Sequence, residues 1–324
     1  MALVQHTDHG RLDWRLGAGC DYIAILLRLM FLMPPFKCRI KYSLMLLLVL
    51  SLGACSKPDA GEERALVVSV RPLALIAQEI TGGDIPIRVL IEGADPHHYA
   101  PSVSDRAALE RALLLVWLGP QMEGVLAKQA ALLPIEKRMQ LLGGSAFEYQ
   151  GASPSDPHLW LRPRNAAIAA AQIAQRLAEL RPQQAELFIR RARVFSSAMA
   201  NLQKVLDRAL YGYRQVPIVV THDAYGHFFG SAGVVTLPLG DGSGGGHGAR
   251  AMLALSSVGN GCLFGEVPAN DRDRQLAENL GLRYAALDPL GEQLGPDANY
   301  RDLIESLLTQ ARSCLSEIPD NGGD

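Results

Sequence analysis

The sequence has almost no excess of charge of either sign, with 31 Lys and Arg residues against 33 Asp and Glu residues. It therefore lacks the basic surplus with which nucleic-acid-binding proteins neutralise phosphate groups, and no nucleic-acid partner is expected. The main apolar run, residues 44–52, is shorter than the roughly 20 residues that a membrane-spanning helix needs. No Cys-x-x-Cys pair occurs, which argues against a zinc site built from thiolates.

Two familiar functional motifs are also missing. The glycine-rich stretch Gly240–Gly248 lacks the spacing and the following Lys of a P-loop, so phosphate binding is not expected there. No His-Glu-x-x-His sequence occurs, and a zinc hydrolase would have to use Glu92, Asp95 or Asp288 as the base for a metal-bound water. A hydrolase is therefore a distant alternative.

What the chain does have near its start is an export signal. Lys37, Arg39 and Lys41 precede the short apolar run, which ends in Leu-Gly-Ala-Cys55. This ending matches a bacterial lipobox, so residues 1–54 are interpreted as a leader and Cys55 as the lipid-carrying N-terminus of a periplasmic or extracytoplasmic lipoprotein anchored to the membrane. The alternative is an ordinary signal peptide with a chance cysteine. The first part of the leader is interpreted as a misassigned start, with translation beginning at a later methionine.

The cysteines predict one disulfide. Of the five cysteines, Cys20 and Cys38 lie in the leader and Cys55 is the expected lipid site, which leaves Cys262 and Cys314. In an exported protein a remaining pair of this kind is usually oxidised. The bridge would close a loop of about 50 residues and stabilise the fold by about 4 kcal/mol in the chain-entropy model. The alternative is two buried free thiols.

The body of the chain alternates between short apolar segments and amphipathic ones. This alternation is typical of parallel sheets whose strands are covered on both faces by helices. Helices are expected at Leu73–Ile80, Asp105–Ala112, Arg272–Leu280 and Tyr300–Cys314. Strands are expected at Leu66–Val70, Ile87–Ile91, Leu113–Leu118, Pro217–Thr221, Val234–Leu237, Cys262–Glu266 and Arg283–Leu287.

The middle of the chain predicts an Ala-rich helix over residues 165–180 and a longer one over 182–213. Pro182 suits a first helical turn, and apolar residues then recur every three or four positions from Phe188 to Tyr213. The long helix is interpreted as a coiled-coil arm or as a strut shared by two α/β lobes with a cleft between them. The expected parts are a leader (1–54), a tether (55–64), an N-terminal lobe (65–181), a linking helix (182–214), a C-terminal lobe (215–318) and a tail (319–324).

Histidines occupy three places where α/β folds put ligands, near the ends of strands or at the start of the helical middle. They are His97 with its neighbour His98, His158 and His222. Any one of them alone is more often an ordinary surface or hydrogen-bonded residue, but three neutral imidazoles that converge suit Zn²⁺. His227 is expected beside the site or at the surface, and His247 in solvent, so substitutions at these two positions should matter little.

Five segments resemble the solute-binding proteins of bacterial zinc and manganese ABC transporters, and match the zinc-uptake branch best. The resemblance covers about residues 65–316 and implies two α/β lobes joined by a long rigid helix. The segments are Asp95-Pro-His-His-Tyr99, Leu115-Val-Trp-Leu-Gly-Pro-Gln-Met-Glu123, Asp156-Pro-His-Leu-Trp-Leu161, Thr221-His-Asp-Ala-Tyr-Gly226 and Leu287-Asp-Pro-Leu-Gly291.

The resemblance implies a set of site residues. His97, His158 and His222 would be the imidazole ligands. Asp288 stands where several relatives supply a fourth, carboxylate ligand, a place that water or another group can take in zinc-type members. The pair Cys262 and Cys314 matches a cysteine pair of the zinc branch. The loop before the second ligand, residues 143–155, has no histidine, so a metal-collecting role for it is not expected. Ala100 replaces a usual acidic residue.

The expected function is therefore capture of Zn²⁺ outside the cytoplasmic membrane and its delivery to a permease with an ATPase subunit, by a monomer that is not an enzyme. The same scaffold tuned for Mn²⁺ or Fe²⁺ is the main alternative, because oxygen-rich sites suit Mn²⁺ whereas nitrogen-rich sites favour Zn²⁺. A histidine at position 222, where the manganese branch often has a carboxylate, favours zinc. A surface adhesin is compatible with a lipid anchor.

Overall fold

The computed structural model describes residues 64–93, 95–149, 156–239 and 260–318. All of them belong to one structural unit. The predicted leader, the lipid site Cys55, His247 in the glycine-rich stretch and the C-terminal tail lie outside the described residues. Among the described residues, no helix combines the length and the apolar character needed to cross a membrane.

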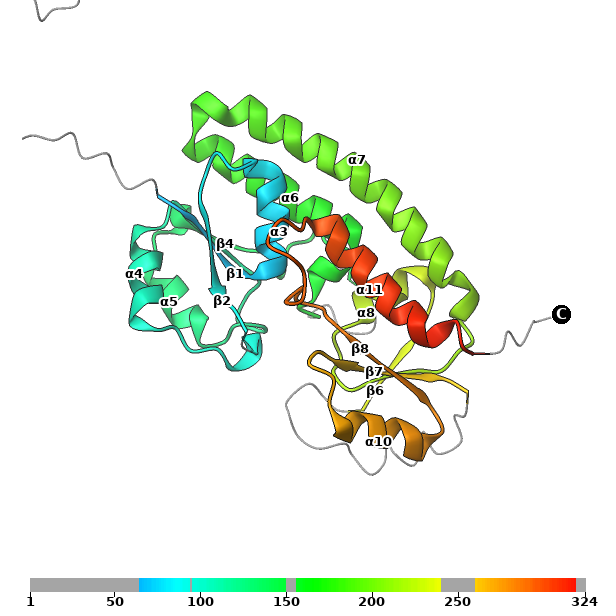
Figure 1. The fold of residues 1–324 in the computed structure, drawn as a ribbon. Helices are drawn as coiled ribbons and strands as arrows, with labels where there is room; N and C mark the ends of the chain where they lie inside the picture. Colours follow the sequence, from blue (N-terminus) through cyan, green and yellow to red (C-terminus); the bar gives the residue numbers. More distant parts are fainter. Residues whose placement is uncertain (1–63, 94, 150–155, 240–259, 319–324) are drawn as a thin grey trace, which may run out of the picture. The chain divides into compact units, whose positions relative to one another are not determined.

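The N-terminal lobe is built on a four-stranded parallel sheet with the order β2-β1-β3-β4. In this order the strands are Ile87–Ile91, Leu66–Val70, Leu114–Trp117 and Arg138–Gln140. Every residue of β1 is buried, because the strand pairs on both edges and is covered by helices. The helices of this lobe are α3 (Arg71–Thr81), α4 (Val103–Arg111) and α5 (Leu126–Leu132) (Figure 1).

The C-terminal lobe repeats this architecture with the order β6-β5-β7-β8. In this order the strands are Thr236–Pro238, Ile218–Val220, Cys262–Glu266 and Arg283–Leu287, and all pairs are parallel. Its helices are α8 (Gly226–Phe229), α10 (Asp271–Leu280) and α11 (Tyr300–Leu315). The predicted disulfide is present: Cys262 in β7 and Cys314 in α11 are bridged, with their Cα atoms 6.2 Å apart.

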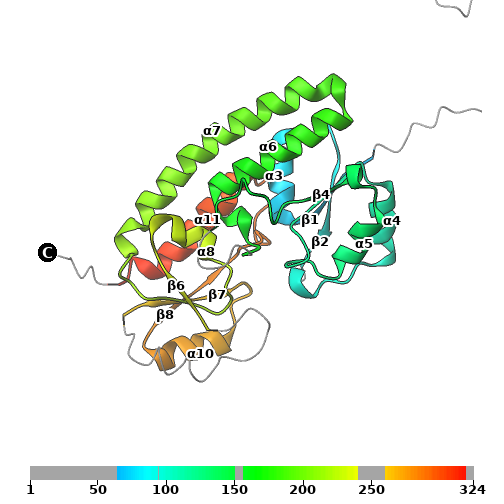
Figure 2. The same cartoon turned by 180° about the vertical axis from the view of Figure 1, so that it is seen from behind.

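Two antiparallel helices connect the lobes, α6 (Pro163–Leu180) and α7 (Ala185–Leu210), and they pack along each other (Figures 1 and 2). The single helix predicted from 182 to 213 is α-helical only over the 26 residues of α7, with 3-10 turns at Pro182–Gln184 and Tyr211–Tyr213. Its predicted apolar stripe is buried from Phe188 to Leu210. The stripe therefore packs against the lobes, as expected for a strut rather than a projecting arm.

One hydrophobic core runs from the first sheet through α6 and α7 into the second lobe. A separate small cluster lies beneath α10. Side chains also join the two lobes directly: the indole N–H of Trp160 donates to the carbonyl of Pro289 at 2.8 Å, and the Tyr300 hydroxyl donates to the carbonyl of Trp160. These contacts hold the carboxyl ends of the two sheets near one another.

Candidate metal centre

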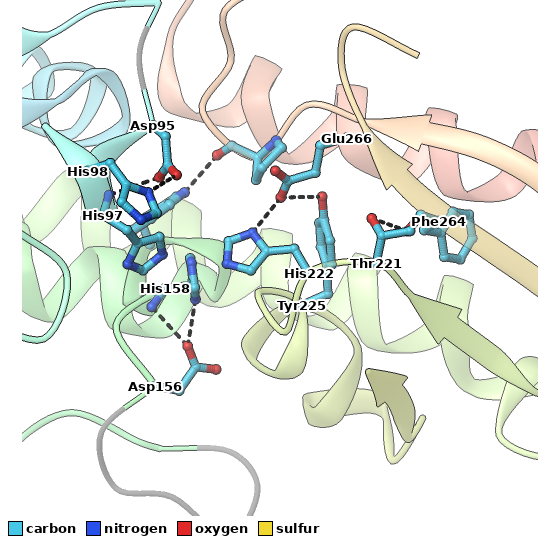
Figure 3. A network of polar contacts seen from close by, with 12 residues as sticks. Asp95, His97, His98, Asp156, His158, Thr221, His222, Tyr225, Phe264 and Glu266 are labelled. Carbon is cyan, nitrogen blue, oxygen red and sulfur yellow. Dashed lines mark hydrogen bonds and ion pairs between the residues drawn. The ribbon is translucent and has the colours of Figure 1, made fainter. Parts of the chain in front are cut away.

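The three histidines predicted from the sequence meet in one place, although they lie on three separate segments. His97 is in the 3-10 turn Pro96–His98 after β2, His158 directly precedes the 3-10 turn Leu159–Leu161, and His222 follows β5. One ring nitrogen from each lies within 4.8 Å of the others. The ring centroids are 5.0 to 5.8 Å apart, and Figure 3 shows the rings side by side.

Carboxylates on the outer side of this cluster fix the orientation of two rings. Asp156 Oδ1 accepts hydrogen bonds from the Nδ1 of His158 at 2.9 Å and from its backbone N–H at 3.0 Å. Glu266 Oε1 accepts from the Nδ1 of His222 at 2.9 Å and from the hydroxyl of Tyr225 at 3.2 Å (Figure 3). In both rings the proton is thereby held on Nδ1, which leaves Nε2 as the free lone pair.

Two of the ring nitrogens that face the centre of the cluster lack hydrogen-bond partners within the described part of the protein. The Nε2 atoms of His97 and His158 are buried and have no hydrogen-bond partner among the described residues. The turn that carries His97 is held by Asp95 Oδ1, which accepts its backbone N–H at 2.9 Å. A buried nitrogen without a partner is costly in an isolated protein, and a cation between the rings would remove that cost.

The electrostatics of the site differ from ring to ring. Burial and the neighbouring imidazoles lower the pKa of His97, which favours its neutral form. Burial also lowers the pKa of His222, but the hydrogen bond and charge of Glu266 outweigh this and raise it above 6.5. Burial raises the pKa of Glu266 and of Asp156, yet their histidine partners outweigh it and keep both groups ionised. Two negative charges thus stand directly behind the rings.

Asp288, predicted from the family resemblance as a fourth ligand, is not among the three groups whose ligand atoms cluster. Its side chain is buried, and its two oxygens accept the backbone N–H groups of Glu292 and Gln293 at 2.9 and 2.8 Å. In this structure the carboxylate therefore orders the loop that follows β8.

The structure also resolves the position of two further histidines. His98 is exposed and bonded to Asp95 through its Nδ1 at 2.7 Å. His227 is fully buried, with Nε2 3.3 Å from the carbonyl oxygen of Asp156 and 3.5 Å from its Oδ2. Of the two expected positions for His227, beside the site or at the surface, the structure shows the first.

Glu266 is a partner of the site that was not predicted from the sequence. A signal for it was present, since Glu266 ends the apolar strand β7 just as His222 follows the apolar strand β5. In parallel sheets such strand ends lie at a common edge. Glu266 therefore carries the same positional signal as His222: a potential ligand or ligand partner at the end of an apolar parallel strand.

The model of the family described as zinc-uptake complex component A, periplasmic (ZnuA), matches residues 66–314. The chain belongs to this family. A high-affinity zinc uptake system protein ZnuA of Yersinia pestis is 31% identical over 293 residues, which cover 78% of this chain and 91% of the relative. The corresponding protein of Brucella suis biovar 1 is 28% identical over 331 residues, which cover 85% and 99%. A crystal structure of ZnuA shares the fold with a TM-score of 0.66 at 24% identity, covering 78% of this chain and 98% of that one.

Membership of the ZnuA family confirms the central predictions from the sequence. The chain is an extracytoplasmic zinc-binding component of an ABC transporter, and zinc is its metal. The predicted architecture, two parallel-sheet lobes joined by a long helical strut, is confirmed as well.

Proposed function

We propose that His97, His158 and His222 are the zinc ligands of this chain and that the ion is captured between the two lobes. The observation that carries this proposal is the convergence of three imidazole nitrogens within 4.8 Å. Neutral imidazole is a preferred ligand of Zn²⁺, and two of the rings already hold their protons on the outer nitrogen. Nitrogen donors alone favour Zn²⁺ over Mn²⁺.

We assign the fourth coordination position to a water molecule in preference to Asp288. Both oxygens of Asp288 are engaged with backbone N–H groups of Glu292 and Gln293, and ligation would require the loop to give up these bonds. If Asp288 is not a ligand, Asp288→Asn should disturb the loop and leave the zinc stoichiometry and the Co²⁺ absorption spectrum unchanged.

We propose delivery to a membrane permease with an ATPase subunit, and no catalysis. A hydrolase needs a free general base beside the metal-bound water. The carboxylates behind the rings, Asp156 and Glu266, are each bonded to a histidine, which supports a binding role.

The proposed chain organisation remains a leader over 1–54, a lipid on Cys55, a tether to residue 64, lobes over 65–181 and 215–318, and a linking helix over 182–214, in a monomeric protein.

Competition titration tests the ligand set. Each of His97, His158 and His222 is replaced by Ala in turn, and zinc affinity is measured against a chromophoric chelator. Loss of one metal–nitrogen bond should weaken binding by at least about 100-fold, given that loss of an outer partner of a ligand already costs 10–100-fold. The exposed His98→Ala variant is the matched control. Parent-like affinity in any of the three variants would remove that residue from the ligand set, and preference for Mn²⁺ over Zn²⁺ would contradict the metal assignment.

A further inference from the structure

Behind the proposed ligand His158, the residue Asp156 is held from two sides. Its carboxylate accepts the Nδ1–H and the backbone N–H of His158, as described above. On its other side stands His227, a fully buried residue in α8. The α8 segment follows His222 by only a few residues, and α8 packs against the 3-10 turn that begins after His158. Asp156 therefore lies where the segments carrying two of the proposed ligands meet.

The geometry defines which ring nitrogen of His227 carries the proton. Its Nε2 lies 3.3 Å from the backbone carbonyl oxygen of Asp156, and a carbonyl can only accept a hydrogen bond. Nε2 is thus protonated and points at both the main chain and, at 3.5 Å, the Oδ2 of Asp156. The opposite nitrogen of His227, Nδ1, is buried without a partner among the described residues. The contact to Asp156 is therefore the polar interaction that orients this ring.

The absence of a side chain at Gly226, the first residue of α8, leaves space for the same carboxylate. A Cβ atom built on Gly226 would lie 3.1 Å from Oδ2 of Asp156, which is the one side-chain atom that it would meet within 4 Å among the described residues. A separation of that size is shorter than ordinary van der Waals contact, so any larger residue at position 226 would press on Asp156. Gly226 and His227 together form a pocket for one carboxylate.

We propose that His227 is a positioning residue of the zinc site: it holds Asp156, and Asp156 holds the ring of His158 with its Nε2 toward the metal. This inference rests on the proposed ligand set. It differs from the sequence-based expectation that substitutions at His227 matter little, because the sequence does not show that Asp156 lies between the two imidazoles.

The test compares His227→Leu, which removes the N–H donor, with His227→Gln, which retains one. His227→Leu should weaken zinc binding by about 10-fold, the lower end of the effect of losing a direct partner of a metal-ligating histidine, because His227 acts on His158 through Asp156. His227→Gln should recover most of this loss. Phe229→Leu is the matched control. It shortens a buried side chain in the same helix, and the ring of Phe229 contacts Phe228 and Phe264. It should lower thermal stability without the loss of affinity.

A metal-free readout separates this inference from the proposed function. Long-range ¹H–¹⁵N spectra of the imidazoles report the tautomer of His158, which should be the Nδ1–H form in the parent and a mixture in His227→Leu. If the parent protein bound no zinc, the proposed function would be wrong, but the tautomer of His158 would still show whether His227 positions Asp156. Unchanged affinity together with an unchanged tautomer in His227→Leu would overturn the inference.

A second variant guards against failure of His227→Leu to fold. Gly226→Ala leaves His227 in place and crowds Asp156, so it should also weaken zinc binding and perturb the His158 tautomer. Gly212→Ala is its control, because a Cβ at Gly212 meets no atom within 4 Å. Equal zinc affinities for Gly226→Ala and Gly212→Ala would contradict a role for this pocket.

Discussion

At the scale of single residues, the site is a set of three imidazoles whose chemistry is set by the groups behind them. Glu266 is the clearest case, because it bonds both His222 and Tyr225 and is the cause of the raised pKa of His222. A carboxylate in this place makes the imidazole a stronger donor to a metal and fixes its tautomer. Residues behind the ligands therefore contribute to affinity without touching the ion.

Replacing Glu266 with Gln should weaken zinc binding by about 10–100-fold, because the negative charge behind His222 is lost. Competition with a chromophoric chelator measures the change. Glu278→Gln, on the exposed face of α10, is a charge-matched control and should bind zinc like the parent. Equal affinities for the two variants would show that Glu266 has no influence on the site.

The same substitution has a predictable pH dependence in the metal-free protein. Because the folded-state pKa of His222 is raised above its unfolded value, its interaction with Glu266 stabilises the fold fully below about pH 6.5 and is lost as the pH rises through the folded-state pKa. Urea unfolding should therefore show a larger deficit for Glu266→Gln on the acid side of this range than at pH 8. A deficit that grows with increasing pH would reverse the assigned sign.

At the scale of secondary-structure elements, helix ends hold the loops that carry the site. Helix α4, which follows the His97 turn, begins with a capping box in which Ser102 and Asp105 bond each other's backbone N–H groups. Asp105 also accepts hydrogen bonds from Tyr99 and Arg88. Burial raises the pKa of Asp105, but these bonds outweigh it and bring the pKa to about 2.

Asp105→Asn should lower the free energy of unfolding by about 1–2 kcal/mol at neutral pH, the usual size of a lost helix cap. Because the folded-state pKa is depressed, the stabilisation by Asp105 is complete above the unfolded value of roughly 3.9 and is lost as the pH falls toward 2. Thermal unfolding at neutral pH and at pH 2 should therefore show the parent and the variant converging in acid. A constant difference across this range would contradict the assignment.

At the scale of the whole molecule, several attachments join the two lobes, and no single loop separates them. The helical strut is reinforced by the bonds among Trp160, Pro289 and Tyr300, and by Arg71, whose guanidinium donates to the carbonyls of Leu294 and Gly295 at 2.9 and 2.8 Å. A large hinge motion needs a few residues free to change their backbone angles. Zinc capture should instead involve movement of the loops near His158 and His222.

Solution X-ray scattering with and without Zn²⁺ should accordingly show almost the same radius of gyration. Thermal stability should nevertheless rise on zinc binding, by about 2.7 kcal/mol when free zinc is 100 times its dissociation constant. A marked compaction on adding zinc would contradict the account of a rigid strut, even with zinc binding intact.

The disulfide between β7 and α11 should be a substantial part of the stability of the C-terminal lobe. It closes a loop of 52 residues, and its removal in a Cys262→Ala/Cys314→Ala variant should cost up to about 4 kcal/mol on the chain-entropy model. Denaturant unfolding of the parent and the double variant measures this cost. Alkylation of either thiol in the unreduced parent would show that the bridge is absent.

The fold class and the disulfide partners could be predicted from local sequence features, and the family resemblance added the three candidate ligands. Local apolar runs such as β1 predict buried strands. Apolar residues spaced three or four positions apart predict the buried stripe of α7. The short strand β4, half-exposed and three residues long, has no such local signal and was not predicted. Tertiary structure decided the ends of α7 too, since both continue into 3-10 turns.

The groups that stand behind the ligands could not be predicted from the sequence, because they come from distant parts of the chain. Glu266 is 44 residues from His222, and His227 is 71 residues from Asp156. Asp288 has the residue type of a ligand, but its carboxylate accepts hydrogen bonds from backbone N–H groups of its own loop. The physical reason is that hydrophobic periodicity reports burial along the chain, whereas hydrogen-bond partners depend on how distant segments are placed side by side by the packed core.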